Sequence, residues 1–342
     1  MKKSTIKTIG FALLSMTVLA ACGNDDTATE GSDKGDKKEF KLGMVTDLGS
    51  VNDKSFNQSA WEGLQKLEKD KGYEVKYLEP KADSEVEPSI LQFVNSKTDL
   101  TWATAATLAD AVTTIAKSNP DAKLGIVDAD IEGIDNIVSV SFKENEGAFL
   151  AGVVAASMTE TDKIGFVGGM EIPVIQRFHA GFEAGVKAVN PDAQVVVNYV
   201  GVFNRVDMGK SAASTMYNDG VDIIFHAAGG TGNGVFNEAQ ERFDNGEKVW
   251  VIGVDKDQSL EFGDDVTLTS MMKYVDNAVY EISEKTAQGN FPGGEVVRLG
   301  LAEDSVGLAT TSDKNVPKDI LDLVEDYKAK IVSGDITVPE KP

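Results

Sequence analysis

The chain has 342 residues, with 33 Lys and Arg against 55 Asp and Glu, a formal net charge of -22 and one cysteine. An acidic surface repels phosphate backbones, which argues against nucleic acid as a partner; simple solubility outside the cell is the other explanation of the charge. The length exceeds that of a usual single core and predicts two lobes.

The N-terminus has the features of a secretory signal peptide over residues 1-21. Three lysines precede an apolar run over residues 9-19, and small residues lead to Cys22. A transmembrane anchor is the alternative, but the apolar run is shorter than the ~20 residues that a spanning helix needs. The run resembles a bacterial lipobox, which implies that Cys22 is diacylated, with palmitate among the chains, and becomes the mature N-terminus.

An acylated Cys22 leaves no thiol in the mature chain, because it is the only cysteine. A disulfide, a thiolate nucleophile and a cysteine-bound metal are then excluded. Two acyl chains give stable anchoring to a bilayer. Residues 22-38 hold no apolar side chain larger than Ala beyond the cysteine, so we expect a flexible tether that reaches about 20–25 Å.

Residues 39-143 alternate short apolar runs with segments of helical period, which predicts a βαβ pattern. The expected strands are 40–46, 74–78, 100–104, 123–127 and 137–140, and the expected helices are 57–71, 87–95 and 108–118.

A second set of the same kind follows. The expected strands are 163–167, 194–199, 221–225 and 249–254, and the expected helices are 144–158, 173–189, 206–218 and 235–243. Further on we expect a strand over 267–271, a helix over 275–287, strands over 295–301 and 305–309, and a helix over 320–332.

These elements predict an α/β fold of two doubly wound parallel-sheet lobes joined by a hinge. Lobe 1 is expected to hold residues 39-143 plus about 273-303, and lobe 2 residues 144-272 plus about 304-342. The chain would cross between them near 142–144, near 272–274 and within 300–305.

Ligands of open α/β sheets meet the loops beyond the carboxyl ends of the strands. Asp128 and Asp255 each follow an expected strand, and Phe203 and Lys273 occupy similar loop positions. The two carboxylates can accept hydrogen bonds from a neutral polar ligand. Solvating a loop or capping a helix is the alternative role for either of them.

The loop after the first strand offers more candidates. Asp47 follows the strand, and Phe56 and Asn57 come at the start of the next helix. Asp53 or Ser55 is expected to cap that helix. Phe56 is a candidate ligand contact, with a hydrophobic staple against the helix as the alternative.

A glycine-rich stretch over residues 229–234 follows another strand and opens a helix. It lacks the Gly-Lys-Ser/Thr ending of a P-loop and the spacing of a dinucleotide fingerprint. We expect the backbone at Gly230 to approach a ligand closely. Glycines of purely structural use at a helix start are the alternative.

Catalytic groups are few. His179 and His226 are the only histidines and have no paired metal spacing. Asp128 and Asp130, with Asp135, are the one carboxylate group that a metal or acid/base site could use. We expect no cofactor, no metal and no enzymatic activity.

Four segments resemble the basic membrane protein (Bmp) family of bacterial lipoproteins, above all its purine nucleoside receptors. They are DLGSVNDKSFNQSAWEG (47–63), FKENEGAFLAGVVAA (142–156), KIGFVGGMEIPVIQRFHAGFEAGVKAVNP (163–191) and VIGVDKDQ (251–258). The resemblance implies a type I periplasmic-binding-protein-like fold. It also implies a substrate receptor of an ABC importer, tethered to the extracytoplasmic face of the cell membrane.

The same resemblance implies roles for individual residues. A purine nucleoside of the adenosine, guanosine and inosine class would hold its base between the rings of Phe56 and Phe203. Positions near the base match Asp47, Asn57 and Asp128, and positions near the ribose match Asp255 and Lys273.

The expected partners are this nucleoside, an ABC permease and, through the lipid anchor, the membrane, with the protein itself a monomer. The alternatives are a receptor for another solute such as a sugar, an exported nucleoside hydrolase that uses Asp128 and Asp130, and a surface adhesin.

Overall fold

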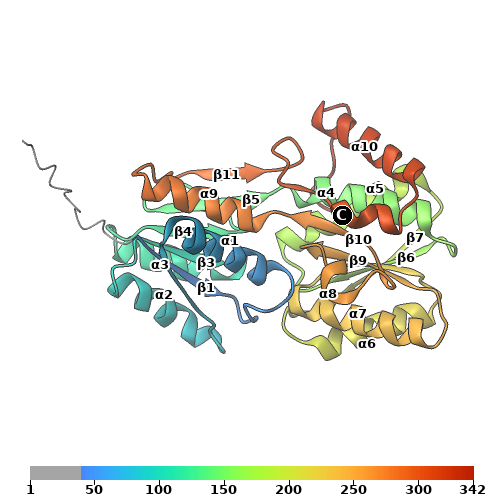
Figure 1. The fold of residues 1–342 in the computed structure, drawn as a ribbon, viewed down its shortest axis with the longest axis horizontal. Helices are drawn as coiled ribbons and strands as arrows, with labels where there is room; N and C mark the ends of the chain where they lie inside the picture. The colour runs from blue at the N-terminus through green and yellow to red at the C-terminus, as the bar shows by residue number, and fades with distance from the viewer. Residues whose placement is uncertain (1–39) are drawn as a thin grey trace, which may run out of the picture. The chain divides into compact units, whose positions relative to one another are not determined.

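The structure is a computed structural model that describes residues 40–342 (Figure 1). The predicted signal peptide over 1-21, the lipidation site Cys22 and the tether over 22-38 lie outside the described residues. Residues 40–342 build two six-stranded sheets, called here the first and the second sheet.

The first sheet is parallel throughout and has the strand order β11-β5-β4-β3-β1-β2. Its strands are β1 (Lys41–Thr46), β2 (Glu74–Leu78), β3 (Leu100–Thr104), β4 (Leu124–Val127), β5 (Ile137–Phe142) and β11 (Val296–Leu299).

The second sheet has the order β12-β10-β9-β8-β6-β7. Its strands are β6 (Lys163–Gly168), β7 (Gln194–Tyr199), β8 (Ile223–Ala227), β9 (Trp250–Asp255), β10 (Thr267–Lys273) and β12 (Val306–Leu308).

One edge strand of the second sheet departs from the parallel pattern. β12 runs antiparallel to β10, with Met272 opposite Gly307. The chain leaves the first sheet at the carboxyl end of β11 and reaches β12 through residues 300–305. It therefore enters the second sheet at the edge where the parallel strands end and must run back against them.

Ten helices in residues 40–342 cover the sheets. They are α1 (Phe56–Lys71), α2 (Val86–Asn95), α3 (Ala109–Ser118), α4 (Glu144–Met158), α5 (Pro173–Val189), α6 (Val206–Asn218), α7 (Gly232–Asp244), α8 (Ser259–Phe262), α9 (Val275–Ala287) and α10 (Lys318–Val332). The bounds agree with the predicted ones to within a few residues. α8 was not predicted, because one turn is too short to show a helical period.

Each sheet is covered on both faces, as parallel sheets require. On the first sheet α1 and α9 pack together on one face, and α2 and α3 on the other. On the second sheet α4 and α5 cover one face with α10 packed on α4, and α6 and α7 cover the other (Figure 1). The alternation along β1, with Leu42 and Met44 in one core cluster and Val45 in another, reflects the two-residue period of a strand.

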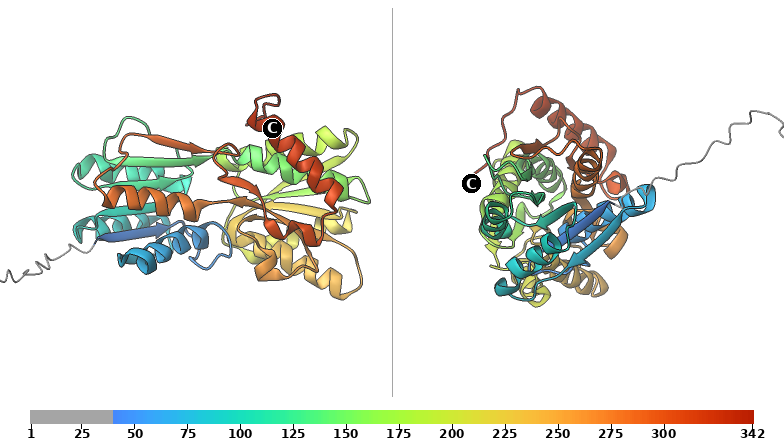
Figure 2. Two further views of the ribbon diagram at one scale, coloured as in Figure 1. Left: turned by 45° about the horizontal axis from the view of Figure 1, so that its top comes forward. Right: turned by 90° about the vertical axis from the view of Figure 1, so that its left-hand side faces the viewer.

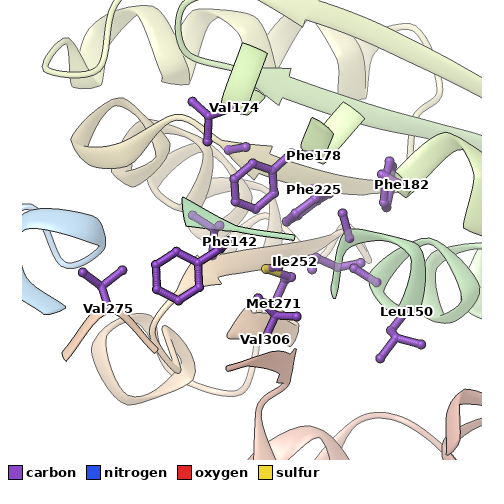
Figure 3. Packing of buried hydrophobic residues seen from close by; sticks show 14 of the residues in the cluster. Phe142, Leu150, Val174, Phe178, Phe182, Phe225, Ile252, Met271, Val275 and Val306 are labelled. Atoms are coloured by element: carbon purple, nitrogen blue, oxygen red, sulfur yellow. The ribbon is translucent and has the colours of Figure 1, made fainter. Parts of the chain in front are cut away.

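The chain passes between the sheets three times, after β5, after β10 and after β11 (Figures 1 and 2). The largest apolar cluster continues through these passages, where Phe142, Met271 and Val275 lie near Phe178 of α5 (Figure 3). The predicted lobe boundaries stay a prediction, which the division of the strands between two sheets supports.

A long-range hydrogen bond fixes α9 to the first sheet. Trp102 of β3 is fully buried and donates from Nε1 to Ser283 Oγ of α9 at 2.9 Å. We expect Ser283→Ala to lower the free energy of unfolding in urea by about 1–3 kcal/mol, because a buried donor is left without an acceptor. Ser118→Ala, at an exposed position of α3, is the control. Equal stabilities of the two variants would contradict this.

Candidate functional site

A cavity lies where loops at the carboxyl ends of both sheets meet. The empty space inside its lining, open solvent at the mouth included, is about 620 Å³. All eight residues predicted for the site contribute to the lining, and they are Asp47, Phe56, Asn57, Asp128, Phe203, Gly230, Asp255 and Lys273. The structure therefore brings together residues that are up to 226 positions apart in the chain (273 minus 47).

The first-sheet side of the cavity is set by a chain of hydrogen bonds. Asn57 accepts from Thr104 Oγ1 at 2.9 Å and donates from Nδ2 to Asp47 Oδ1, also at 2.9 Å. Gly49 N donates to the same oxygen of Asp47 at 2.8 Å. The amide of Asn57 is thus oriented from both ends, and no bond within the described chain occupies Asp47 Oδ2. That oxygen is left to accept from a ligand.

The structure shows which of Asp53 and Ser55 caps α1, a choice that the sequence left open. Ser55 holds the N-cap position but makes no capping bond, since its hydroxyl donates to Asp255 Oδ2 of the second sheet. The carboxylate of Asp53 accepts hydrogen bonds instead from the main-chain N–H groups of Asn57 at 2.9 Å and Gln58 at 3.1 Å. Asp53 is therefore the helix cap, and Ser55 links the two sides of the cavity.

Aromatic rings enter the cavity from both sheets. Phe56 comes from the first turn of α1 and Phe203 from the loop after β7, and both are half-buried. The ring of Phe203 lies so close to Gly169 that a Cβ there would be 2.1 Å from its Cε1. Phe178 of α5 also lines the cavity and was not predicted, because its helical spacing looked like that of a core residue.

The glycine-rich stretch supports the loop of Phe203. Gly229–Thr231 forms a 3-10 turn before α7, and Thr231 N donates to the carbonyl of Phe203 at 2.9 Å. A Cβ at Gly230 would be 3.3 Å from that same carbonyl. The glycines thus let two loops of the second sheet approach each other at the cavity wall.

Two carboxylates turn away from their strands in the same manner. Asp128 follows β4 and Asp255 ends β9, and both have left-handed backbones with φ of 70° and 64°. Aspartate adopts this conformation more readily than most residues. The sharp turn at the strand end brings each carboxylate into the lining of the cavity.

Lys273 is the one cationic residue in the lining, and its side chain is 1% exposed. Its ammonium donates to both oxygens of Asp128 at 2.6 and 2.7 Å and lies 3.2 Å from Glu144 Oε1. Arg177 donates to the other oxygen of Glu144 at 2.6 Å. The sequence did not identify Glu144 or Arg177, since they come from α4 and α5 and neither lines the cavity.

Three phenyl rings surround the same ammonium. The centroids of Phe56, Phe142 and Phe178 lie 5.0, 5.1 and 5.7 Å from Lys273 Nζ, within the range of cation–π attraction. Lys273 therefore links the ring of Phe56 to the charged groups of the site.

Burial and charge shift the pKa values of these groups. Burial raises the pKa of Asp47 and of Asp255, and raises that of Asp128 to about 6 although Lys273 opposes the shift. Burial would lower the pKa of Lys273, but the carboxylates of Asp128, Glu144 and Asp255 outweigh it and raise that pKa. The lysine is thus charged at neutral pH.

Of the carboxylates proposed for chemistry, only Asp128 lines the cavity. Asp130 is not in the lining and pairs with Arg298 of β11 at 2.8 Å. His226 is buried, and its Nε2 lies 2.8 Å from Gln258 Oε1. Burial lowers the pKa of His226 to about 4. Within residues 40–342, no cluster of three His, Cys, Asp or Glu side chains is placed to hold a metal ion. Each helix in that part of the chain is too short or too polar to span a bilayer.

Two doubly wound sheets with a lined cavity between their loops define a two-lobed solute-binding protein. The chain belongs to the Bmp family, described as ABC transporter substrate-binding protein PnrA-like, whose sequence model matches residues 40–342. The fold is accordingly that of the type I periplasmic binding proteins, and the role of the family is substrate binding.

Three known proteins are similar to this chain. A "CD4+ T-cell-stimulating antigen" of Listeria innocua is 47% identical over the whole of both chains. An "ABC transporter nucleoside-binding protein BmpA" of Lactococcus lactis is 40% identical, again over both whole chains. A crystal structure of ABC transporter system solute-binding proteins from Aeropyrum pernix has a TM-score of 0.81 at 28% identity, and covers 88% of this chain and 94% of its own.

The helix cap Asp53 makes stability depend on pH. Burial raises its pKa from 3.8 to about 7, so between these values the folded state binds a proton that the unfolded state releases. Stability should then fall as the pH rises through this window, by up to about 1.4 kcal/mol per unit from this group. Asp53→Asn does not titrate, so we expect its loss of stability relative to the unmodified protein to shrink from pH 4 to pH 7 in urea unfolding.

The control for this experiment is Asp207→Asn. Its hydrogen bond with Arg205 lowers the pKa of Asp207, which places its titration below the window. The stability difference of this variant should stay constant from pH 4 to pH 7. A constant difference for Asp53→Asn as well would contradict the assignment.

Proposed function

We propose that this chain is a lipid-anchored receptor of an ABC importer, which closes two lobes around a purine nucleoside and passes it unaltered to a permease. The observation that carries the proposal is the pair of rings, Phe56 and Phe203, which enter one cavity from opposite sheets beside hydrogen-bonding side chains. The name of the relative in Lactococcus lactis, a nucleoside-binding protein, supports the same ligand class.

The rings would clasp the purine base. Stacking of a base on an aromatic side chain contributes about 1–3 kcal/mol and needs no particular base. The oriented amide of Asn57 and the free oxygen of Asp47 would read the polar edge of the base. Asp128 would join them, since each of its oxygens retains a lone pair beside the bond from Lys273.

The ribose would meet Asp255 and Lys273. Ser55 donates to Oδ2 of Asp255, which leaves Oδ1 to accept from a sugar hydroxyl. The ammonium of Lys273 can donate to a ribose oxygen while Asp128 and Glu144 hold it in place. Gly230 would let the backbone of the second lobe come close to the ligand.

Closure needs no chemistry, only better contacts in the shut state than in the open one. The lobes would be residues 39-143 plus about 273-303, and 144-272 plus about 304-342. The membership of β11 in the first sheet and of β12 in the second supports this division. Lipidation at Cys22 would hold the receptor at the extracytoplasmic face of the cell membrane.

The direct test is mass spectrometry of the small molecules that co-purify with the protein, followed by titration with adenosine, guanosine, inosine and cytidine. A purine nucleoside should be found and should be recovered intact after incubation with pure protein. Release of free base from inosine or guanosine would instead indicate a hydrolase.

Truncating either ring should weaken the binding of every purine nucleoside. For Phe56→Ala and Phe203→Ala we expect a loss of about 5- to 150-fold in calorimetric affinity for adenosine, guanosine and inosine alike, as stacking on one ring is removed. Phe243→Ala is the matched control, since this ring is 41% exposed on α7 and outside the cavity. Unchanged binding by both cavity variants would refute the clasp.

A phosphate group should be rejected. The lining holds the carboxylates of Asp47, Asp128 and Asp255 against the single ammonium of Lys273, and apposed like charges are costly. We expect inosine 5′-monophosphate to bind at least about tenfold more weakly than inosine. Equal affinities in calorimetry would contradict a nucleoside receptor of this kind.

A further inference from the structure

Gln258 is a buried donor that is aimed from the second sheet at the opposite lobe. Its Oε1 accepts from Val254 N at 2.9 Å and from His226 Nε2 at 2.8 Å. A main-chain N–H can only donate, so this oxygen is assigned and the amide nitrogen must face the other way. There it donates to the carbonyl of Lys54 at 3.0 Å, in the loop between β1 and α1.

The packing around Gln258 keeps this orientation. The side chain is fully buried, and its main-chain N donates to Ser270 Oγ at 3.0 Å. A Cβ at Gly253 would be 2.7 Å from Gln258 Oε1, so the site requires glycine there. Contacts within the second lobe alone thus orient the amide nitrogen of Gln258 toward the first lobe.

Two more side-chain amides of the second lobe bind the same loop. Asn204 donates from Nδ2 to the carbonyl of Leu48 at 2.9 Å. Asn233 donates from Nδ2 to the carbonyl of Asp53 at 3.2 Å. Neither they nor Gln258 contributes to the lining of the ligand cavity.

Lys54 reinforces the contact with its side chain. Its ammonium lies 3.7 Å from Glu261 Oε2 and 4.5 Å from the ring centroid of Phe262, both in α8. That ring stacks on Phe236 of α7 with centroids 4.1 Å apart. The backbone of Lys54 is left-handed, with φ of 61°, so the loop holds a conformation that a lysine rarely adopts.

We infer that the loop over residues 48–54 and the amides of Asn204, Asn233 and Gln258 form a closure latch, which stabilises the shut receptor without touching its ligand. This inference rests on the proposed function in that closure is taken to accompany nucleoside binding. The three amides bind main-chain carbonyls of the loop, and the side chain of Lys54 adds to this contact.

Weakening the latch should lower the affinity for every nucleoside and leave the preference for one base over another unchanged. The apparent affinity for a ligand that binds only the shut form is its intrinsic affinity multiplied by the fraction of receptor that is shut, and this factor is the same for every ligand. Residues in the cavity, in contrast, change the preference of the site for one base over another. The two kinds of residue are therefore separable by experiment.

The test uses Asn204→Asp and Asn233→Asp in the full chain, which replace a donor with a carboxylate of the same shape. Each should bind inosine and guanosine about threefold to tenfold more weakly in calorimetry, as expected for one lost hydrogen bond. The ratio of the two affinities should equal that of the unmodified protein. Asn204 is exposed, so its variant is expected to fold.

Asn245→Asp is the matched control, because Asn245 is exposed at the end of α7 and should bind both nucleosides normally. Small-angle X-ray scattering without ligand should give a larger radius of gyration for the two latch variants only. If the unmodified protein binds neither nucleoside, the proposed function fails while that increase still supports the latch. Unchanged affinities with an unchanged radius, or an altered affinity ratio, would overturn the latch.

Discussion

The buried ammonium of Lys273 ties the cavity to the passages between the two sheets. Lys273 is the last residue of β10. Its partner Asp128 follows β4 of the other sheet, and its partner Glu144 begins α4 just after the first passage between the sheets. A charge without water is tolerated only when it is paired and hydrogen-bonded, and removing one partner of a buried pair typically costs about 3–5 kcal/mol. The need to keep this cation paired therefore holds together the end of β10, the residue after β4 and the start of α4, with the ring of Phe56 beside the ammonium.

The contacts between the lobes fall into two groups with different consequences. Ser55 and Asp255 meet at the cavity itself, where any change is felt by the ligand. The amides of Asn204, Asn233 and Gln258 meet main-chain carbonyls outside it. A binding protein built in this way can alter how tightly it holds all its ligands through the second group, and which ligand it prefers through the first.

The order of the elements could be predicted from the sequence because their apolar periods are local. The candidate site could be predicted in part, since ligand-facing residues of a parallel sheet follow the ends of strands: Asp128 and Asp255 were found in this way, and all eight predicted residues share one cavity. Phe178 was missed because a ring on the buried face of an amphipathic helix gives the same signal whether it lines a cavity or a core. The strand β12 was predicted but its antiparallel direction was missed, because that direction depends on where the chain enters the second sheet.

The sequence by itself determined the acidic composition, the alternation of strands and helices and the membership in the Bmp family, because these are properties of neighbouring residues or of whole segments. Only the tertiary structure decided which acid is paired and which is left for a ligand, and that Asp53 and not Ser55 caps α1. It also decided that three side-chain amides donate hydrogen bonds to the loop over residues 48–54. Hydrogen bonds act over about 3 Å, and the residues that make them across the two lobes come from distant parts of the chain, so their pairing exists only once both sheets are in place.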